Sequence, residues 1–326
     1  MDKIAYLAGG TVIYWNSIVL TLAAATAIFF FLAFYIGKCG NAVAGFAAVP
    51  LSIVLGIVLA RLVHWYSRGD SYDSFTAALT DYTSGGYALL GVFAGCILAA
   101  ALLRLLFLHR DLPEMLDCMC IAGLAGISVG RLASFFNASC RGNVLEELHS
   151  LPFAWPVTNT VSGAVEYRLA TFLIQAAVAL ILFIALAVFY LRGQKTGVRS
   201  GDTCLIFLLV YGASQVVLDS TRYDSLFFRS NGFVSIVQVF GALALGFAIV
   251  MFSIRLVKAR GFKFWMVPLW LIVACFIGGA GFMEYYVQRR GNEAVFAYSV
   301  MTACLLMVIG LTLMIRMLAV SKERGE

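Results

Sequence analysis

Arg131 stands at the end of a predicted apolar span, in a segment of small and polar residues that covers 126–143. An ionisable residue inside a membrane costs at least about 2.5–3.5 kcal/mol on insertion scales and is therefore a functional candidate. Arginine presents a planar fork of donors that suits a phosphate diester. Ser134 shares the face of Arg131 if the helix continues that far. The segment therefore predicts a site for a phospholipid headgroup near the membrane surface.

A second set of polar residues follows one side of a later apolar helix. Tyr211, Gln215, Asp219 and Arg222 stand at positions i, i+4, i+8 and i+11, which is one face of a helix. Such a stripe should point into the helix bundle or into a water-filled cavity rather than toward lipid. A purely structural network is the alternative, with Asp219 paired to Arg222 three residues on.

Arg61 is the other arginine that falls inside an apolar span. It is either a functional residue or a helix-end arginine whose long side chain reaches the lipid headgroups. We expect no metal and no cofactor, because the three histidines are scattered and Cys118 and Cys120 have the wrong spacing for a zinc site.

These side chains must be positioned by membrane-spanning helices. The chain of 326 residues is 62% hydrophobic and 12% charged, against about 45–50% and about 25% in soluble domains, and its net charge of +6 does not indicate nucleic-acid binding. A bilayer core needs about 20 apolar residues per helix. Nine such windows predict an all-α polytopic membrane bundle with an external loop over about 137–168, after the fourth span. The predicted spans are 11–37, 44–66, 86–108, 115–136, 170–191, 203–220, 233–254, 264–285 and 294–317.

The basic residues predict the orientation of this bundle. With the N-terminus outside, 13 of the 23 lysines and arginines fall in the inner loops and eight in the outer loops, as the positive-inside rule requires. The outer loops also carry most of the acidic residues. We therefore expect an external N-terminus and a cytoplasmic C-terminus.

Several segments resemble the motifs of the prolipoprotein diacylglyceryl transferase family. One family signature reads roughly G-R-x-G-N-F-x-N-x-E-x-x-G, a second reads Y-G-x-x-R-x-x-x-E-x-x-R, and a third reads S-x-x-Q. The order, spacing and predicted topology agree over about residues 10–258. The matching residues are Gly130, Arg131, Asn137 and Gly142 for the first motif, Tyr211, Gly212 and Arg222 for the second, Ser235 and Gln238 for the third, and Arg61 for a basic residue of the second span.

The resemblance implies a reaction and a site. Family members move the sn-1,2-diacylglyceryl group from phosphatidylglycerol to the lipobox cysteine of a preprolipoprotein, at the outer face of the bacterial inner membrane, and glycerol phosphate leaves. Residues 1–258 would form a seven-helix core, and 259–326 an added two-helix hairpin with a cytoplasmic tail. The phospholipid-binding residues would be Arg131, Ser134, Asn137, Gly142, Arg222, Arg61 and Gln238, and the catalytic residues would include Tyr211 and Asp219.

The chain departs from the family pattern at positions that should carry chemistry. Leu90 stands where the family has a histidine, and Gln215 stands where it has an arginine. Ser134 and Ser139 replace an asparagine and a glutamate. A site that lacks the family's proton acceptor and one phosphate-facing arginine is slow, uses other groups, or does not run this reaction.

Other residues could replace the missing proton acceptor. A thiolate is the competent nucleophile, so a base must remove the thiol proton. His64, one turn beyond Arg61, is the best local substitute, and Tyr211 and Asp219 are alternatives. Three functions follow: a transferase with a modified site, a non-catalytic relative that binds phospholipid or lipoprotein signal peptides, and a small-molecule transporter, for which no inverted repeat is visible.

Overall fold

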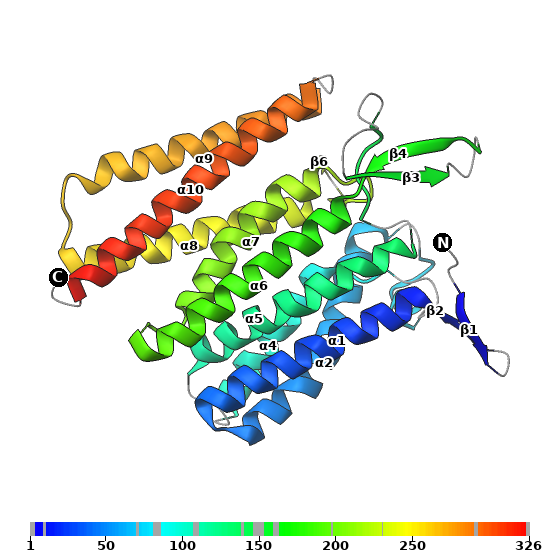
Figure 1. Ribbon diagram of the computed structural model, residues 1–326, viewed down its shortest axis with the longest axis horizontal. Coiled ribbons are helices and arrows are strands. Elements are labelled where there is room, and N and C mark those ends of the chain that lie inside the picture. Colours follow the sequence, from blue (N-terminus) through cyan, green and yellow to red (C-terminus); the bar gives the residue numbers. More distant parts are fainter. Residues whose placement is uncertain are drawn as a thin grey trace. The chain divides into compact units, whose positions relative to one another are not determined.

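The computed structural model describes residues 4–8, 11–69, 72–80, 86–106, 111–137, 140–145, 153–158, 163–196, 198–229, 231–289 and 293–323. The described chain is mostly helical (Figure 1). Eight of its helices are long and apolar enough to cross a membrane, and a ninth apolar helix is shorter. The prediction of an all-α polytopic membrane bundle is confirmed.

The elements follow the predicted spans closely. The long helices are α1 (Trp15–Cys39), α2 (Ala42–Ser67), α5 (Leu112–Gly130), α6 (Thr171–Thr196), α7 (Asp202–Ser220), α8 (Ile236–Arg260), α9 (Met266–Arg289) and α10 (Ala294–Glu323), and the shorter helices are α3 (Phe75–Thr80), α4 (Leu89–Leu105) and the 3-10 helix η2 (Arg131–Phe135). The strands are β1 (Ile4–Ala8), β2 (Thr11–Tyr14), β3 (Ala154–Thr158), β4 (Val165–Leu169), β5 (Phe227–Phe228) and β6 (Asn231–Ser235).

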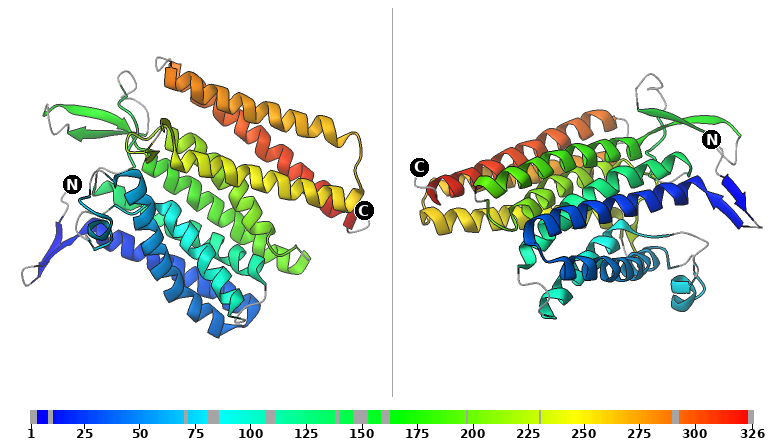
Figure 2. Two further views of the ribbon diagram at one scale, coloured as in Figure 1. Left: turned by 180° about the vertical axis from the view of Figure 1, so that it is seen from behind. Right: turned by 60° about the horizontal axis from the view of Figure 1, so that its bottom comes forward.

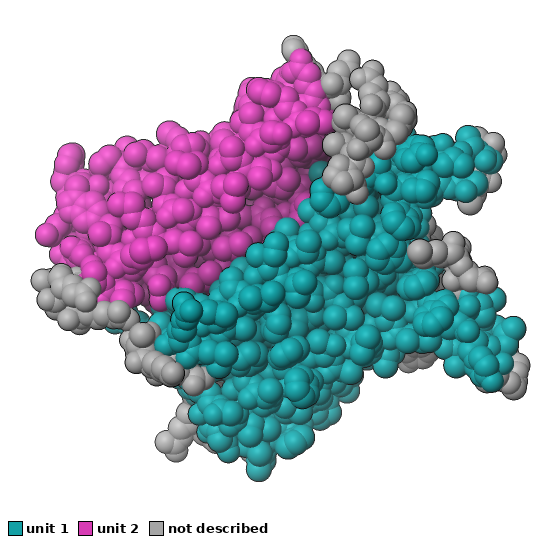
Figure 3. Space-filling model, in the orientation of Figure 1, with its two compact units in different colours: residues 1–204, 221–232 teal, residues 205–220, 233–326 magenta. Residues whose placement is uncertain are grey.

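The chain divides into two compact units, which Figure 3 shows in different colours. Unit 1 consists of residues 1–204 and 221–232, and unit 2 of residues 205–220 and 233–326. The candidate functional residues fall in both units: Arg131 and Arg222 lie in unit 1, and Tyr211 and Asp219 lie in unit 2. The predicted division into 1–258 and 259–326 rests on the family resemblance and stays a prediction.

In unit 1, α1 packs against α5, α5 against α6, and α2 against α4 (Figures 1 and 2). The contact between α2 and α4 is very close. A Cβ atom on Gly91 would lie 2.3 Å from the backbone of Ala60, and one on Gly95 would lie 2.5 Å from the backbone of Gly56. Small residues therefore let these two helices meet backbone to backbone, as they commonly do in membranes.

A buried carboxylate of α5 holds the start of α7. Asp117 is 1% exposed. It accepts hydrogen bonds from the backbone N–H of Gly201 at 2.7 Å and of Cys204 at 2.6 Å. The first N–H groups of a helix have no partner within the helix and favour a negative charge. Asp117 therefore caps α7 from a neighbouring helix of unit 1.

In unit 2, α10 packs against α8 and α9. Arg260 at the end of α8 donates to the carbonyl of Leu318 at 2.7 Å and to the hydroxyl of Ser321 at 2.7 Å, both on α10. At the other end, the hydroxyl of Ser220 donates to Glu284 of α9 at 3.0 Å and lies 3.2 Å from the hydroxyl of Tyr298 of α10. Hydrogen bonds thus tie α10 to the rest of unit 2 at both ends, and α9 at one end.

Two segments differ from the sequence prediction. Residues 11–14 form a strand paired antiparallel with β1, so the first helix begins at Trp15 and not at residue 11. Val12 and Ile13 are apolar but β-branched, and such residues favour extended backbone. The predicted external loop contains the antiparallel pair β3–β4, with Ala154 opposite Leu169 and Thr158 opposite Val165.

Candidate functional site

Arg131 lies directly after α5, in the first position of η2. The side chains at i and i+3 of a 3-10 helix point the same way, so Arg131 and Ser134 share a face as expected, although the α-helix itself has ended. The Nη1 of Arg131 donates to the Sγ of Cys140 at 2.8 Å. Cys140 is buried and has a φ of 57°, a left-handed conformation that is uncommon for a residue with a Cβ atom.

Asp224 joins Cys140 to a second arginine. Its Oδ2 accepts from the backbone N–H of Cys140 at 2.9 Å, and its Oδ1 accepts from the Nε of Arg222 at 3.0 Å and pairs with the Nη2 of Arg222 at 3.0 Å. Arg131, Cys140, Asp224 and Arg222 thus form one connected group, which we call the arginine cluster. It brings together two arginines that stand 91 positions apart in the sequence.

Gly142 lies beside the arginine cluster at a place where no side chain fits. It forms an antiparallel bridge with Arg222, and its N–H donates to the carbonyl of Leu169 at 2.7 Å. A Cβ atom on Gly142 would lie 2.6 Å from the Cβ of Leu169 and 2.8 Å from the Oγ1 of Thr171. The glycine therefore allows the segment after Cys140 to approach the end of β4.

The polar residues around η2 are bound to neighbouring elements. Ser134 is buried. The Nδ2 of Asn137 donates to the Oδ1 of Asn16 at 2.9 Å. The backbone carbonyl of Asn137 accepts from the Nη2 of Arg141 at 2.9 Å. Burial, together with the positive charge of Arg168, lowers the pKa of the Arg141 guanidinium. A second cationic side chain thus lies close to Arg131 in the sequence and is also partly buried.

Arg61 and His64 form a separate group in unit 1. Arg61 is 2% exposed, so it does not reach for the headgroups as one interpretation proposed. It donates to the carbonyls of Ala78 and Gly86. Its guanidinium also lies over the rings of Tyr72 and Tyr87, at 5.1 and 5.2 Å from their centroids. The Nδ1 of His64 lies 3.0 Å from the hydroxyl of Tyr72.

The candidate residues of unit 2 lie where α7 and α8 meet. The hydroxyl of Ser235 donates to Asp219, and the side chain of Gln238 accepts from the N–H of Ser235 at 3.0 Å and donates to the carbonyl of Val216 at 3.2 Å. Ser235 and Gln238 form a capping box at the start of α8. Gln238 therefore helps to fix the N-terminal end of α8.

The predicted polar stripe of α7 points inward. Tyr211, Gln215 and Asp219 are 6%, 5% and 1% exposed, which agrees with a stripe that faces the bundle. Arg222, the fourth predicted member, does not continue the stripe, because α7 ends at Ser220 and Arg222 pairs with Asp224. The ring of Tyr211 stacks on that of Phe207 at 5.1 Å. Two glycines allow the helices to cross here, since a Cβ atom on Gly212 would lie 2.7 Å from the carbonyl oxygen of Gly241.

Sequence reasoning missed two members of the arginine cluster. Neither Asp224 nor Cys140 is among the site residues predicted from the sequence. The available signal was the position of Cys140 between Arg131 and Gly142 of one motif. For Asp224 the signal was its position two residues after Arg222 of a second motif, whereas its contact with Cys140, 84 residues away, has no signal in the sequence.

A buried carboxylate on α9 was also missed. Glu284 is 8% exposed, and its Oε1 accepts from Ser220 and from Gln288. It lines a cavity of about 420 Å³ together with Gln238. Within the described residues, no group of three or more His, Cys, Asp or Glu side chains could hold a metal ion.

The comparisons with known proteins decide the family. The model of the prolipoprotein diacylglyceryl transferase family matches residues 3–254. The chain belongs to this family. It is 28% identical to the phosphatidylglycerol–prolipoprotein diacylglyceryl transferase of Streptococcus sanguinis (strain SK36) over 203 residues, which cover 60% of this chain and 76% of that protein.

A second relative matches over a longer stretch. The chain is 26% identical to the enzyme of the same name from Lactococcus lactis subsp. cremoris (strain MG1363) over 269 residues, 79% of this chain and 96% of that protein. The family match and the apolar helices together identify a multi-pass membrane protein of the prolipoprotein diacylglyceryl transferase family. The family model ends within α8, so α9 and α10 lie beyond it.

Proposed function

We propose that this protein transfers diacylglyceryl from phosphatidylglycerol to the lipobox cysteine of preprolipoproteins, at the outer face of the bacterial cytoplasmic membrane. The arginine cluster is the observation that supports this function most directly. It places the guanidinium groups of Arg131 and Arg222 in one network of unit 1, through Cys140 and Asp224. Two guanidinium groups in one network suit a lipid phosphate better than an isolated arginine does.

The proposed reaction needs a cationic site for its leaving group. The acceptor thiolate attacks the carbon of the diacylglyceryl unit that carries the phosphate. A C–S bond forms at this carbon, its C–O bond to the phosphate breaks, and the headgroup leaves as glycerol phosphate with the electron pair of that bond. Arg131 and Arg222 would offset the negative charge that grows on this phosphate. Ser134, Asn137 and Gly142 would shape the headgroup pocket around them.

The proton of the acceptor thiol must go to a base. His64 is our first candidate, because its Nδ1 faces the hydroxyl of Tyr72, and such a contact orients the ring and leaves Nε2 for a second partner. Tyr211 and Asp219 remain alternative catalytic residues. The hydrogen bond from Ser235 to Asp219 favours a positioning role for that carboxylate.

The orientation follows from the distribution of basic residues. An external N-terminus and a cytoplasmic C-terminus would place the end of α5, with η2 and the arginine cluster, at the outer surface. The donor lipid and the peptide acceptor would then meet on that side. The partners are phosphatidylglycerol, a preprolipoprotein signal peptide and the surrounding membrane lipids.

A second candidate function is phospholipid or signal-peptide binding without transfer. Leu90 and Gln215 favour it, because by resemblance they stand where family members carry a histidine and an arginine. Leu90 cannot take up the thiol proton, and the neutral amide of Gln215 brings no positive charge to a departing phosphate. Binding by the arginine cluster would survive these two replacements.

One experiment separates the two functions. The purified full chain is incubated with phosphatidylglycerol and a lipobox peptide, and the diacylglyceryl thioether and the bound lipid are both measured by mass spectrometry. Transfer that is lost in Arg131→Ala and kept in Arg104→Ala, an exposed arginine of α4, supports the enzyme. Lipid bound through Arg131 without any thioether supports the binding protein. If Arg131→Ala changes neither quantity, both proposals are wrong.

A further inference from the structure

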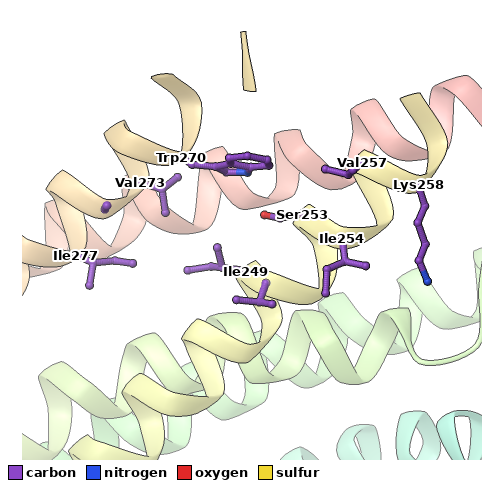
Figure 4. A pocket seen from close by; sticks show the side chains of 10 residues that line it. Ile249, Ser253, Ile254, Val257, Lys258, Trp270, Val273 and Ile277 are labelled. Carbon is purple, nitrogen blue, oxygen red and sulfur yellow. The ribbon is translucent and has the colours of Figure 1, made fainter. Parts of the chain in front are cut away.

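A groove of about 610 Å³ lies between α8 and α9 of unit 2. Both helices are apolar enough to span a membrane, and α9 lies beyond the part of the chain that matches the family. Figure 4 shows the groove with its side chains. The lining residues are Ile249, Val250, Ser253, Ile254, Val257, Lys258, Trp270, Val273, Ala274 and Ile277.

Most of the groove wall is apolar and open to the lipid phase. The exposed fractions of Val250, Ile254 and Ile277 are 55%, 42% and 39%. In a bilayer these side chains meet hydrocarbon, so an alkyl chain is the ligand that is both present at high concentration and compatible with the wall. The wall by itself does not select one lipid over another.

Two polar atoms in the wall lack a partner. The Oγ of Ser253 and the Nε1 of Trp270 are buried, and neither has a hydrogen-bond partner in the part of the chain that the structure describes. A polar group in an apolar environment costs free energy unless it is hydrogen-bonded. The indole N–H can only donate, and the hydroxyl can donate as well. A ligand with acceptor oxygens at this depth would satisfy both.

One end of the groove is cationic. Lys258 is the single charged residue among the ten that line it, and it stands two positions before the end of α8. Arg260, the next basic residue, is bound to Leu318 and Ser321 of α10. A lysine at a helix end reaches the headgroup region with its amino group, where it attracts anionic lipids.

The polar groups therefore follow the order of the polar groups in a phospholipid. Figure 4 shows Lys258 at one end, Trp270 and Ser253 in the middle, and Ile277 at the other end. Ser253 and Lys258 are five positions apart, about 7.5 Å along the helix. We propose that the groove binds one anionic glycerophospholipid of the bilayer, with its phosphate at Lys258, its ester oxygens at Ser253 and Trp270, and an acyl chain along Ile249 and Ile277.

This lipid site is independent of the proposed transferase activity. The groove lies in unit 2, and no residue that lines it belongs to the arginine cluster. Both donor atoms are buried, so the side chains around them must move aside for an ester oxygen to reach them. Trp270→Phe keeps an aromatic ring and removes the N–H, and it isolates this hydrogen bond.

Photocrosslinking of lipid in vesicles tests the proposal. The full chain is reconstituted with trace amounts of phosphatidylglycerol or phosphatidylcholine that carry the same diazirine-labelled acyl chain, and crosslinked peptides are mapped by mass spectrometry. We expect phosphatidylglycerol to label 249–258 and 270–277 about fivefold more than phosphatidylcholine does, since one lysine near a headgroup corresponds to roughly that factor. Lys258→Gln should abolish this preference, while Lys263→Gln, at an exposed lysine that follows the end of α8, should keep it.

The hydrogen bonds have a separate signature. Ester groups are common to both lipids, so Trp270→Phe and Ser253→Ala should lower the labelling by both lipids and keep their ratio. Three results would overturn the proposal: equal labelling by the two lipids in the unchanged chain, an unchanged preference in Lys258→Gln, or the same loss in Lys263→Gln. Melting temperatures in detergent verify that each variant is folded.

Discussion

The guanidinium of Arg131 donates to the Sγ of Cys140 at 2.8 Å, while the backbone N–H of the same cysteine donates to Asp224. One residue thus faces two charged groups of opposite sign, with its side chain toward the cation and its backbone toward the anion. The left-handed conformation of Cys140, with a φ of 57°, accompanies this arrangement. Arg131 is thus held by a residue that occupies an unspecified position of the motif to which Arg131 itself belongs.

Asp224 holds the two halves of the arginine cluster together. In Asp224→Ala, the N–H of Cys140 and the guanidinium of Arg222 both lose the carboxylate that accepts from them. The loss of such an acceptor costs about 1–3 kcal/mol, so we expect the free energy of unfolding in detergent to fall by about that amount. Asp73→Ala removes an exposed carboxylate and should leave stability unchanged. Equal effects of the two changes would contradict the network.

The crossing of α2 and α4 should not tolerate an added methyl group. Gly91→Ala would place a Cβ atom 2.3 Å from the backbone of Ala60, and the helices would have to separate. Overpacking of this kind costs about 1–3 kcal/mol. At Gly123 of α5 a Cβ atom would meet nothing within 4 Å, so Gly123→Ala should be neutral or slightly stabilising. Melting temperatures of both variants check the difference, and a stable Gly91→Ala would show that the helices cross elsewhere.

The cap that Asp117 provides for α7 should depend on its two oxygens. Asp117→Ala leaves the N–H groups of Gly201 and Cys204 without an acceptor, and we expect a loss of about 1–3 kcal/mol in the free energy of unfolding. Asp117→Asn keeps one carbonyl oxygen and should lose about half as much. Chemical denaturation of the two variants measures the ratio of their losses in the free energy of unfolding. If the asparagine variant is as unstable as the alanine variant, the role of Asp117 is not that of a cap.

The last two helices should be coupled energetically to α7. Tyr298→Phe removes the hydroxyl that lies 3.2 Å from Ser220, and Glu284→Gln changes the acceptor of the same serine. Residues that share one network interact by about 0.5–3 kcal/mol in a double-mutant cycle, so the double variant should differ from the sum of the single ones. Tyr285→Phe, at an exposed tyrosine of α9, supplies the control. Additive effects of Tyr298→Phe and Glu284→Gln would indicate two separate contacts.

Much of the fold could be predicted from the sequence because a lipid-spanning helix needs a long apolar run. The predicted spans from 44 to 317 coincide with helices α2 and α4 to α10, with ends that differ by a few residues. The segment 11–14 was less predictable, since an apolar run of β-branched residues fits a helix or a strand. The short helix α4 falls below the length that a span usually needs, although its segment is apolar throughout.

The site was predictable only where it is local in sequence. The end of α5 was recognised from Arg131 and its neighbours, and the polar stripe of α7 from its spacing. Ser235 and Gln238 also carry a local signal, because S-x-x-Q is the pattern of a capping box; the structure uses it as one. Glu284 was out of reach, since it lies beyond the family motifs and its partner Ser220 is far away in the chain. Asp224 stands two residues after Arg222, but its contact with Cys140 was out of reach for the same reason.

Arg61 of α2 donates to the carbonyls of Ala78, in α3, and of Gly86, just before α4. A single side chain of α2 therefore holds two other segments of unit 1. A replacement of Arg61 would release both attachments at once, so its effect on the structure would extend beyond α2 itself.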